Sequence, residues 1–226
     1  MRRVPIHESD DPLIDFRVAF PDLLIDRPRF LYRRETLLRA SVAERLGRAD
    51  AGLRPVGLRL AIVEGWRAPH IQTRMYRAAW NWWKERRPEW SDGQLRRTVN
   101  RFTAPVGDRR VPPPHTTGGA VDLMLVDTAG NALDHAGPYE VSDPRGYPTA
   151  ARGLTESAQR TRQTLADALE STGLTNYPSE YWHWSWGDQG WAYRSGHPNA
   201  LYDTILPTPW TPDPADLIDA PLVRLG

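Results

Sequence analysis

Cysteine is absent from this 226-residue sequence, and Lys84 is the only lysine among 29 basic residues. Without cysteine, the chain has no disulfides, no thiolate nucleophile and no cysteine-bound metal site. Any metal must therefore be held by His, Asp or Glu side chains, and only six histidines are available.

Long apolar runs are also missing, since no stretch approaches the ~20 residues of a membrane-spanning helix. Residues 1–16 contain arginines, prolines and acidic residues where a secretory signal needs an unbroken apolar segment. We therefore expect a cytoplasmic protein without a membrane span.

The charge balance lacks an excess of either sign, with 29 Lys and Arg against 28 Asp and Glu. Proteins that bind nucleic acids or membrane surfaces usually carry a large basic excess, so we expect neither partner. Hydrophobic residues make up 40% of the chain, which excludes wholesale disorder. The length fits one domain over residues 1–226, with a proline-rich tail over 207–226 that wraps the surface.

The periodicity of apolar residues indicates an α+β fold. Helical spacing predicts helices in four segments, which are residues 34–48, 69–82, 91–102 and 155–173. Alternation predicts strands over 56–63, over 120–126 paired with 131–133, and over 181–186. Three prolines at 112–114 predict an extended, stiff approach to His115. We expect one domain with a small antiparallel sheet that carries the functional site and helices packed on one side.

One cluster of candidate functional residues is His115-Thr-Thr-Gly-Gly-Ala-Val-Asp122. The histidine lies in a glycine-rich turn, and Asp122 lies in the predicted strand between Val121 and Leu123. Burial of a lone ionised carboxylate is prohibitive, so an Asp122 inside the fold must be paired or bound to a metal. Strand alternation also permits a simpler interpretation, in which Asp122 faces solvent.

A second cluster is Glu180-Tyr-Trp-His183. In a strand, His183 lies on the opposite face from Trp182 and Trp184, so it looks away from a tryptophan-rich core. Glu180 is three residues from His183 and can approach it only if the strand begins after Glu180. Taken alone, a surface glutamate followed by a packed histidine explains this pattern equally well.

Together the two clusters supply two histidines, one aspartate and one further glutamate. Three protein ligands with an open fourth position are what a catalytic zinc ion requires. A free carboxylate beside such an ion can accept a proton from the attacking water and return it to the leaving amine. We interpret the combination as a hydrolytic zinc site.

With these residues in view, the sequence resembles the D-alanyl-D-alanine dipeptidases of vancomycin resistance, within the wider zinc D-Ala-D-Ala peptidase family. The signatures of that family are Ser-x-His-x-x-Gly-x-Ala-x-Asp and Glu-x-Trp-His, downstream of an aromatic-Arg-Pro motif. The corresponding segments here are Gly-Trp-Arg67-Ala-Pro, Pro113-Pro-His115-Thr-Thr-Gly-Gly-Ala-Val-Asp122 and Glu180-Tyr-Trp-His183. The order and spacing agree over roughly residues 13–190.

The resemblance implies a zinc metallopeptidase that hydrolyses D-Ala-D-Ala or a related small dipeptide. It implies that zinc is bound by His115, Asp122 and His183. Glu180 would be the catalytic base and acid, and Arg67 would polarise the scissile carbonyl and stabilise the oxyanion. Arg67 also follows a predicted strand, from which a rigid element can aim a guanidinium, although without the motif a surface arginine is the simpler interpretation. The other histidines match no motif and are expected at the surface: His7, His70, His135 and His197.

Three departures from the family pattern concern substrate recognition. The serine two residues before the first ligand is Pro113 here, and an N-terminal Arg-Tyr-Ala stretch has become Arg-Val18-Ala. The acidic residue that grips the substrate ammonium in the family corresponds to Glu140, with Asp143 as a competing candidate. We therefore take Pro113, Val18 and Glu140 as substrate-binding candidates and expect an altered substrate choice.

Two other functions are compatible with the sequence. A carboxypeptidase or amidase acting on peptidoglycan stems or a peptide-like metabolite would use the same chemistry in an open groove. A non-catalytic binding module would use the ten tryptophans as a contact surface. Trp80, Trp82 and Trp83 share a predicted helix with Met75, however, and are expected in a core or a lid. The intact Glu180 favours an enzyme.

Overall fold

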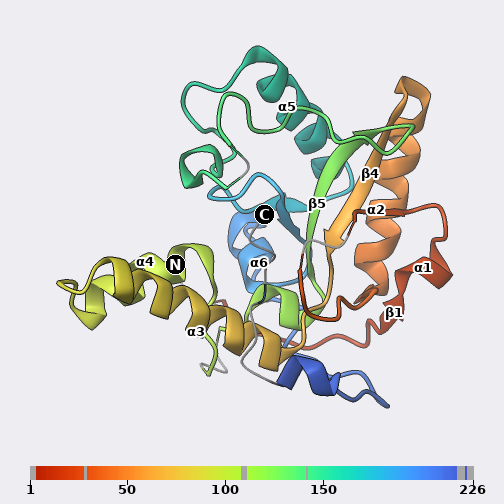
Figure 1. Ribbon diagram of the computed structural model, residues 1–226. Coiled ribbons are helices and arrows are strands. Elements are labelled where there is room, and N and C mark those ends of the chain that lie inside the picture. Colours follow the sequence, from red (N-terminus) through yellow and green to blue (C-terminus); the bar gives the residue numbers. More distant parts are fainter. Residues whose placement is uncertain (1–3, 28–29, 108–110, 141, 218–221, 223–226) are drawn as a thin grey trace.

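The structure is a computed structural model that describes residues 4–27, 30–107, 111–140, 142–217 and 222. It has an α+β fold around a five-stranded mixed sheet of order β2-β4-β5-β7-β6 (Figure 1). The strands of this sheet are β2 (Leu24–Ile25), β4 (Leu58–Glu64), β5 (Ala120–Asp127), β6 (Thr175–Asn176) and β7 (His183–Ser185). A two-stranded sheet pairs β1 (Leu13–Asp15) with β3 (Leu37–Arg39). The described helices are α1 (Phe16–Ala19), α2 (Ala40–Leu53), α3 (Pro69–Arg86), α4 (Asp92–Phe102), α5 (Glu156–Glu170) and α6 (Gln189–Ser195).

The prediction of an antiparallel sheet is wrong at one edge. The pairs β4–β5, β5–β7 and β6–β7 are antiparallel, whereas β2 runs parallel to β4. The chain leaves β2 and passes through β3 and α2 before it enters β4. Such a helical crossover returns the chain in its original direction, so the two strands pair in parallel.

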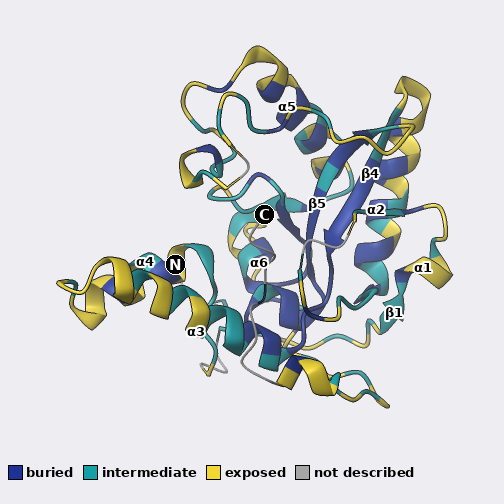
Figure 2. Ribbon diagram, viewed as in Figure 1, coloured by how far each residue is buried: buried dark blue, intermediate teal, exposed yellow. Residues whose placement is uncertain are grey.

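The two faces of the sheet differ in what covers them. The apolar core joins one face of the central strands to α2 and α5, and Figure 2 shows how deeply β4 and β5 are buried. The strand residues in this core are Leu60, Ile62, Val121, Leu123, Leu125 and Trp184. Because strand residues alternate, Asp122 and His183 lie on the other face. Helices α3 and α4 form an arm that extends away from the sheet (Figure 1). The prediction of helices on one side therefore holds for α2 and α5 but not for this arm.

Several predicted boundaries are corrected by tertiary contacts. The helix predicted over 34–48 begins only at Ala40, because residues 37–39 pair with β1 as a strand. It continues through Gly47, which lies against the ring of Phe20, and ends at Leu53. The strand predicted over 181–186 is limited to His183–Ser185. The proline segment is extended at Pro113 but then forms a 3₁₀ helix, η2 (Pro114–Thr117).

Other local predictions are confirmed. Ser91 and Gln94 form the expected capping box at the start of α4, and Thr155 caps α5. The pairing of β5 with 131–133 is present as a bridge between Val126 and Ala132. In the described part of the tail, Trp210 packs edge-on against Trp66.

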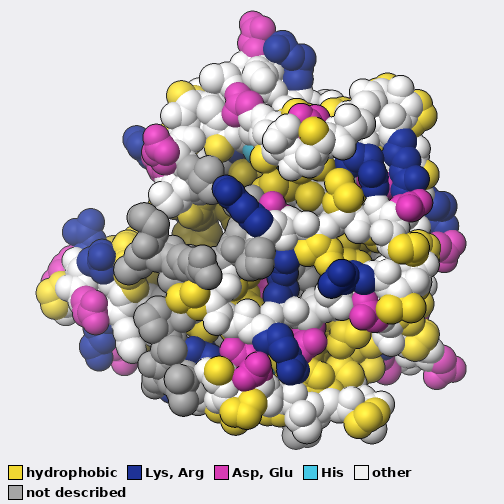
Figure 3. Space-filling view, turned by 45° about the vertical axis from the view of Figure 1, so that its right-hand side comes forward, with side chains coloured by type: hydrophobic (Ala, Val, Ile, Leu, Met, Phe, Trp, Pro, Cys, Tyr) yellow, Lys and Arg dark blue, Asp and Glu magenta, His cyan; other side chains and the backbone are white. Residues whose placement is uncertain are grey.

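Charges of both signs are interspersed on the face shown in Figure 3, in keeping with the small net charge. Among the described residues, no helix is both long enough and apolar enough to cross a membrane.

The buried carboxylate of Asp50 links α2 to β4 through hydrogen bonds. Asp50 is fully buried and accepts hydrogen bonds from Arg54 Nη2 at 2.9 Å, Arg59 Nε at 3.0 Å and the backbone N–H of Leu60 at 2.9 Å. A buried carboxylate with this many donors stabilises the fold as long as its partners are present.

We expect Asp50→Ala to lower the free energy of unfolding by about 3 kcal/mol, because it leaves two arginines and a buried N–H without their acceptor. Urea denaturation of the purified protein measures this. Glu44→Gln is the matched control, since its ion pair with Arg48 is exposed and such pairs contribute about 0–1 kcal/mol. Equal effects of the two substitutions would contradict the prediction.

Candidate metal centre and active site

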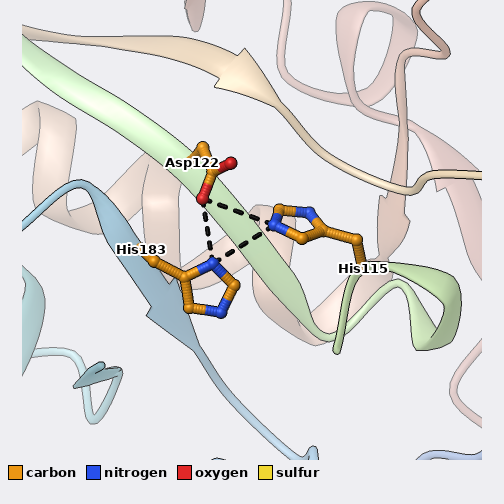
Figure 4. Close-up of side chains that lie close together, drawn as sticks. All are labelled: His115, Asp122 and His183. Carbon is orange, nitrogen blue, oxygen red and sulfur yellow. Dashed lines mark hydrogen bonds and ion pairs between the residues drawn. The ribbon is translucent and has the colours of Figure 1, made fainter. Parts of the chain in front are cut away.

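Three buried side chains converge on the face of the sheet opposite α2 and α5 (Figure 4). His115 Nε2 lies 3.2 Å from His183 Nδ1 and 3.3 Å from Asp122 Oδ1. His183 Nδ1 lies 2.9 Å from the same carboxylate oxygen. The sequence therefore picked out the three residues that the fold brings together, and the interpretation of Asp122 as solvent-facing is wrong.

The cluster fits a divalent metal. Two donor atoms that each lie 2.0–2.1 Å from a tetrahedral ion are separated by about 3.3–3.4 Å, close to the distances found here. Two imidazole nitrogens and one carboxylate oxygen suit zinc, and three ligands leave a fourth position for water or substrate.

A hydrogen bond to its ring and a glycine turn that follows it fix the position of His115. Its Nδ1 donates a hydrogen bond to the carbonyl of Gly65 at 2.8 Å, so the lone pair is on Nε2, the atom that faces Asp122. Gly118 then adopts a φ of 72°, and a Cβ on Gly119 would lie only 2.7 Å from the backbone oxygen of Trp186. The two glycines are therefore what allows the chain to turn from η2 directly into β5.

Asp122 and His183 are opposite each other in the β5–β7 register. Burial alone would raise the pKa of Asp122, but His115 and His183 hold the pKa of this carboxyl well below its usual range. Burial lowers the pKa of His183, and the adjacent Asp122 opposes that shift. Near neutral pH these shifts favour an ionised aspartate and a neutral imidazole, which are the protonation states that metal binding requires.

Glu180 lies in a turn rather than in the strand. Its N–H donates to Tyr177 O at 2.9 Å, and its carbonyl accepts from the N–H of His183 at 3.1 Å. The condition set by the sequence, that the strand begin after Glu180, is therefore met. Burial and the negative charge of Asp122 raise the pKa of Glu180 to about 8, while Arg67 acts in the opposite direction. The pKa of the Glu180 carboxyl therefore responds to the charges of both Asp122 and Arg67.

The raised pKa of Glu180 predicts a pH dependence of stability in the metal-free protein. Between about pH 5 and 8, folded Glu180 binds more protons than it does in the unfolded chain, where its pKa is near 4.5. Its contribution to the free energy of unfolding therefore decreases as pH rises through this window. We expect the difference between wild type and Glu180→Gln to follow this trend in urea denaturation. A difference that is constant with pH would contradict it.

Arg67 follows β4 and is 8% exposed, so its interpretation as a surface arginine is wrong. Its Nε donates to Glu64 Oε1 at 3.0 Å, its Nη2 donates to Glu64 Oε2, and its Nη1 donates to Gln72 Oε1 at 2.7 Å. The same Nη2 lies 3.9 Å from Asp122 Oδ2. The sequence analysis did not identify Glu64, although an acidic residue that directly follows the apolar run of β4 is a signal similar to that of Asp122 within β5.

The three substrate-binding candidates lie in different surroundings. Pro113 is buried and directly precedes η2, two residues from His115. Glu140 is exposed in a loop, and Val18 is 79% exposed on α1 (Figure 1). Asp143, the competing acidic candidate, forms an ion pair with Arg145 at 2.6 Å. The roles of Pro113, Glu140 and Val18 stay predictions.

Two further expectations are corrected. His135 is buried rather than at the surface, because its Nε2 accepts a hydrogen bond from the N–H of Leu125 at 3.0 Å. Trp82 is 46% exposed on the arm formed by α3 and α4, where it contacts Trp83 edge-on and lies under Arg86. This exposure excludes the core alternative for Trp82, whereas the lid alternative stays a prediction.

Comparisons with known proteins find relatives described as D-alanyl-D-alanine dipeptidases. A D-alanyl-D-alanine dipeptidase of Synechocystis sp. is 32% identical over 124 residues, which is half of this chain and half of the relative's own length. The D-alanyl-D-alanine dipeptidase of Escherichia coli is 25% identical over 181 residues, and the match covers 76% of this chain and 82% of that protein.

Two solved structures are also similar. The LdcB LD-carboxypeptidase is 18% identical, with a TM-score of 0.48 over 88% of this chain and 81% of that chain. A mutant of the vancomycin-resistance D,D-pentapeptidase VanY in complex with Zn(II) is 14% identical, with a TM-score of 0.45 over 79% of this chain and 94% of that chain. The sequence profile of peptidase family M15, described as D-Ala-D-Ala dipeptidase, matches residues 10–203. Because that match covers most of the sequence, the chain belongs to the D-Ala-D-Ala dipeptidase family M15.

Proposed function

We propose that this protein is a zinc-dependent dipeptidase that hydrolyses D-Ala-D-Ala or a related small dipeptide. The observation that carries the proposal is the convergence of His115 Nε2, Asp122 Oδ1 and His183 Nδ1 within 3.3 Å of one another. Family membership supports the reaction class, and the donor set supports zinc. The single domain and the cytoplasmic location stay predictions.

His115, Asp122 and His183 would hold the zinc ion. When bound, zinc would lower the pKa of a water ligand to about 7 and polarise the substrate carbonyl. Glu180 accepts the proton of the attacking water and delivers it to the leaving amine. Arg67 donates hydrogen bonds to the carbonyl oxygen and stabilises the negative charge that develops there.

Pro113 predicts a substrate preference that differs from the family's. It has neither a hydroxyl nor a backbone N–H, so it cannot make the hydrogen bonds that a serine makes at this place. Losing such polar contacts weakens the enzyme's discrimination between substrates. We therefore expect kcat/KM for D-Ala-D-Ala to be lower than for some bulkier or differently configured dipeptide.

The zinc-loaded enzyme should be assayed against D,D-, L,D- and L,L-dipeptides and against N-acetyl-D-Ala-D-Ala. Pro113→Ser is the matched variant and should shift the preference toward D-Ala-D-Ala. A sharp wild-type preference for D-Ala-D-Ala would contradict the substrate prediction. Faster cleavage of the acetylated substrate would point to a carboxypeptidase, and no cleavage of any substrate would contradict the proposed function.

A further inference from the structure

Glu64 is a second buried carboxylate beside the metal-ligand cluster, and the reaction proposed above does not use it. It is 1% exposed and ends β4. Regular alternation would turn Glu64 to the same face as Ile62, toward α2 and α5. A register shift between these two residues instead places Glu64 opposite Asp122, on the face that carries the ligands. Bulges of this kind re-aim side chains next to active sites.

Arg67 is the charged partner of this carboxylate. Its two hydrogen bonds to Glu64 form a bidentate pair, which fixes the plane of the guanidinium as well as its position. Gln72 accepts the third bond and in turn donates to the carbonyl of Ala104 at 2.9 Å. These bonds use three of the five N–H donors of Arg67 and leave one on each terminal nitrogen for a substrate oxygen.

Tyr32 holds Glu64 from the other side. Its hydroxyl donates to Glu64 Oε1, and its ring is 7% exposed and stacks on Phe30 with centroids 5.0 Å apart. Burial, together with the negative charge of Glu64, raises the pKa of Tyr32 above its usual value. The hydroxyl therefore keeps its proton and stays a donor to the carboxylate.

Asp122 offers Arg67 a competing ion pair. Arg67 Nη2 lies 3.9 Å from Asp122 Oδ2, against direct hydrogen bonds to both oxygens of Glu64. In the metal-free site, Asp122 is therefore the nearest alternative carboxylate partner among the described ion pairs of Arg67.

We propose that Glu64 and Tyr32 are positioning residues that hold the guanidinium of Arg67 in the orientation needed for the carbonyl oxygen. The inference rests on the proposed function, in which Arg67 contacts the substrate. Glu64 acts through Arg67 and does not itself touch the substrate or the metal.

A double-mutant cycle tests this coupling. Glu64→Gln keeps the shape of the side chain but replaces one acceptor with an N–H donor that faces the guanidinium. We expect it to lower kcat about 10- to 100-fold, less than the ~10²–10³ typical for complete loss of an oxyanion donor. Tyr32→Phe should cause a smaller loss, and KM should change little in both. In an Arg67→Lys background, both losses should shrink to under about threefold, because the group to be positioned is gone.

Zinc content and thermal unfolding of every variant separate positioning from loss of metal or of fold, and Glu44→Gln is the matched control with unchanged kcat. Tyr32→Phe keeps the test available if Glu64→Gln does not fold. Losses that are equally large in the wild-type and Arg67→Lys backgrounds would overturn the proposal.

A second measurement does not depend on activity. In the metal-free protein, the Nε–H NMR signal of Arg67 can be assigned by its absence in Arg67→Lys. We expect slow hydrogen exchange at this group in wild type and exchange at least about tenfold faster in Glu64→Gln. Unchanged exchange would overturn the inference. If wild type cleaves no dipeptide, the proposed function fails, while the exchange rate still decides whether Glu64 holds Arg67.

Discussion

Glu180→Gln is expected to leave zinc bound and to reduce kcat by about 10²–10⁴, the usual contribution of a general acid–base group. The backbone carbonyl of Glu180 accepts a hydrogen bond from the N–H of His183, and the Glu180 carboxylate is not one of the three donor groups that converge in the cluster. The amide keeps the size of the side chain but can neither accept the proton of the water nor return it to the amine. Zinc analysis and steady-state kinetics on the same preparation measure both effects.

The control for this experiment is Glu170→Gln, the same substitution at the exposed end of α5. It should change neither zinc content nor kcat. Near-normal turnover of zinc-loaded Glu180→Gln would remove Glu180 from the mechanism.

Loss of a metal ligand should have the largest effect on binding. We expect about one zinc per chain in wild type, and less than about a tenth of that in His115→Ala and in His183→Ala, with hydrolysis lost in parallel. Each substitution removes one of the three protein ligands. Two protein ligands are too few for a zinc site of this kind, which uses three together with an open fourth position. Elemental analysis after dialysis against a limiting amount of zinc measures the occupancy.

His7→Ala is the matched control, because His7 is exposed and outside the cluster. It should bind zinc as wild type does. Full occupancy in the double variant His115→Ala with His183→Ala would show that the metal is held elsewhere.

Local rules explain which elements could be predicted. The strand expected over 56–63 and the capped starts of α4 and α5 depend on alternation and on Ser91 and Thr155, which act within a few residues. The start of α2 could not be predicted in this way. Residues 37–39 have helical spacing but lie in a strand, because β1 supplies backbone partners from more than twenty residues upstream. Tertiary hydrogen bonding overrides local preference there.

The sequence by itself determined the chemical identity of the site. Two short clusters supply His115, Asp122 and His183, which are three ligands of the kinds that zinc uses. The sequence left open whether Asp122 faces solvent, and the fold decided that it is buried. Glu180 was recognised from the same kind of pattern, together with the family resemblance.

Only the tertiary structure decided how Arg67 is held. The register shift that places Glu64 opposite Asp122 depends on how β4 pairs with β5, more than fifty residues away in the chain. Regular alternation would have sent Glu64 into the apolar core, so its partnership with Arg67 and Tyr32 could not be inferred from spacing. Strand register is set by packing and pairing between distant segments, and a shift of one residue reverses which face a side chain occupies.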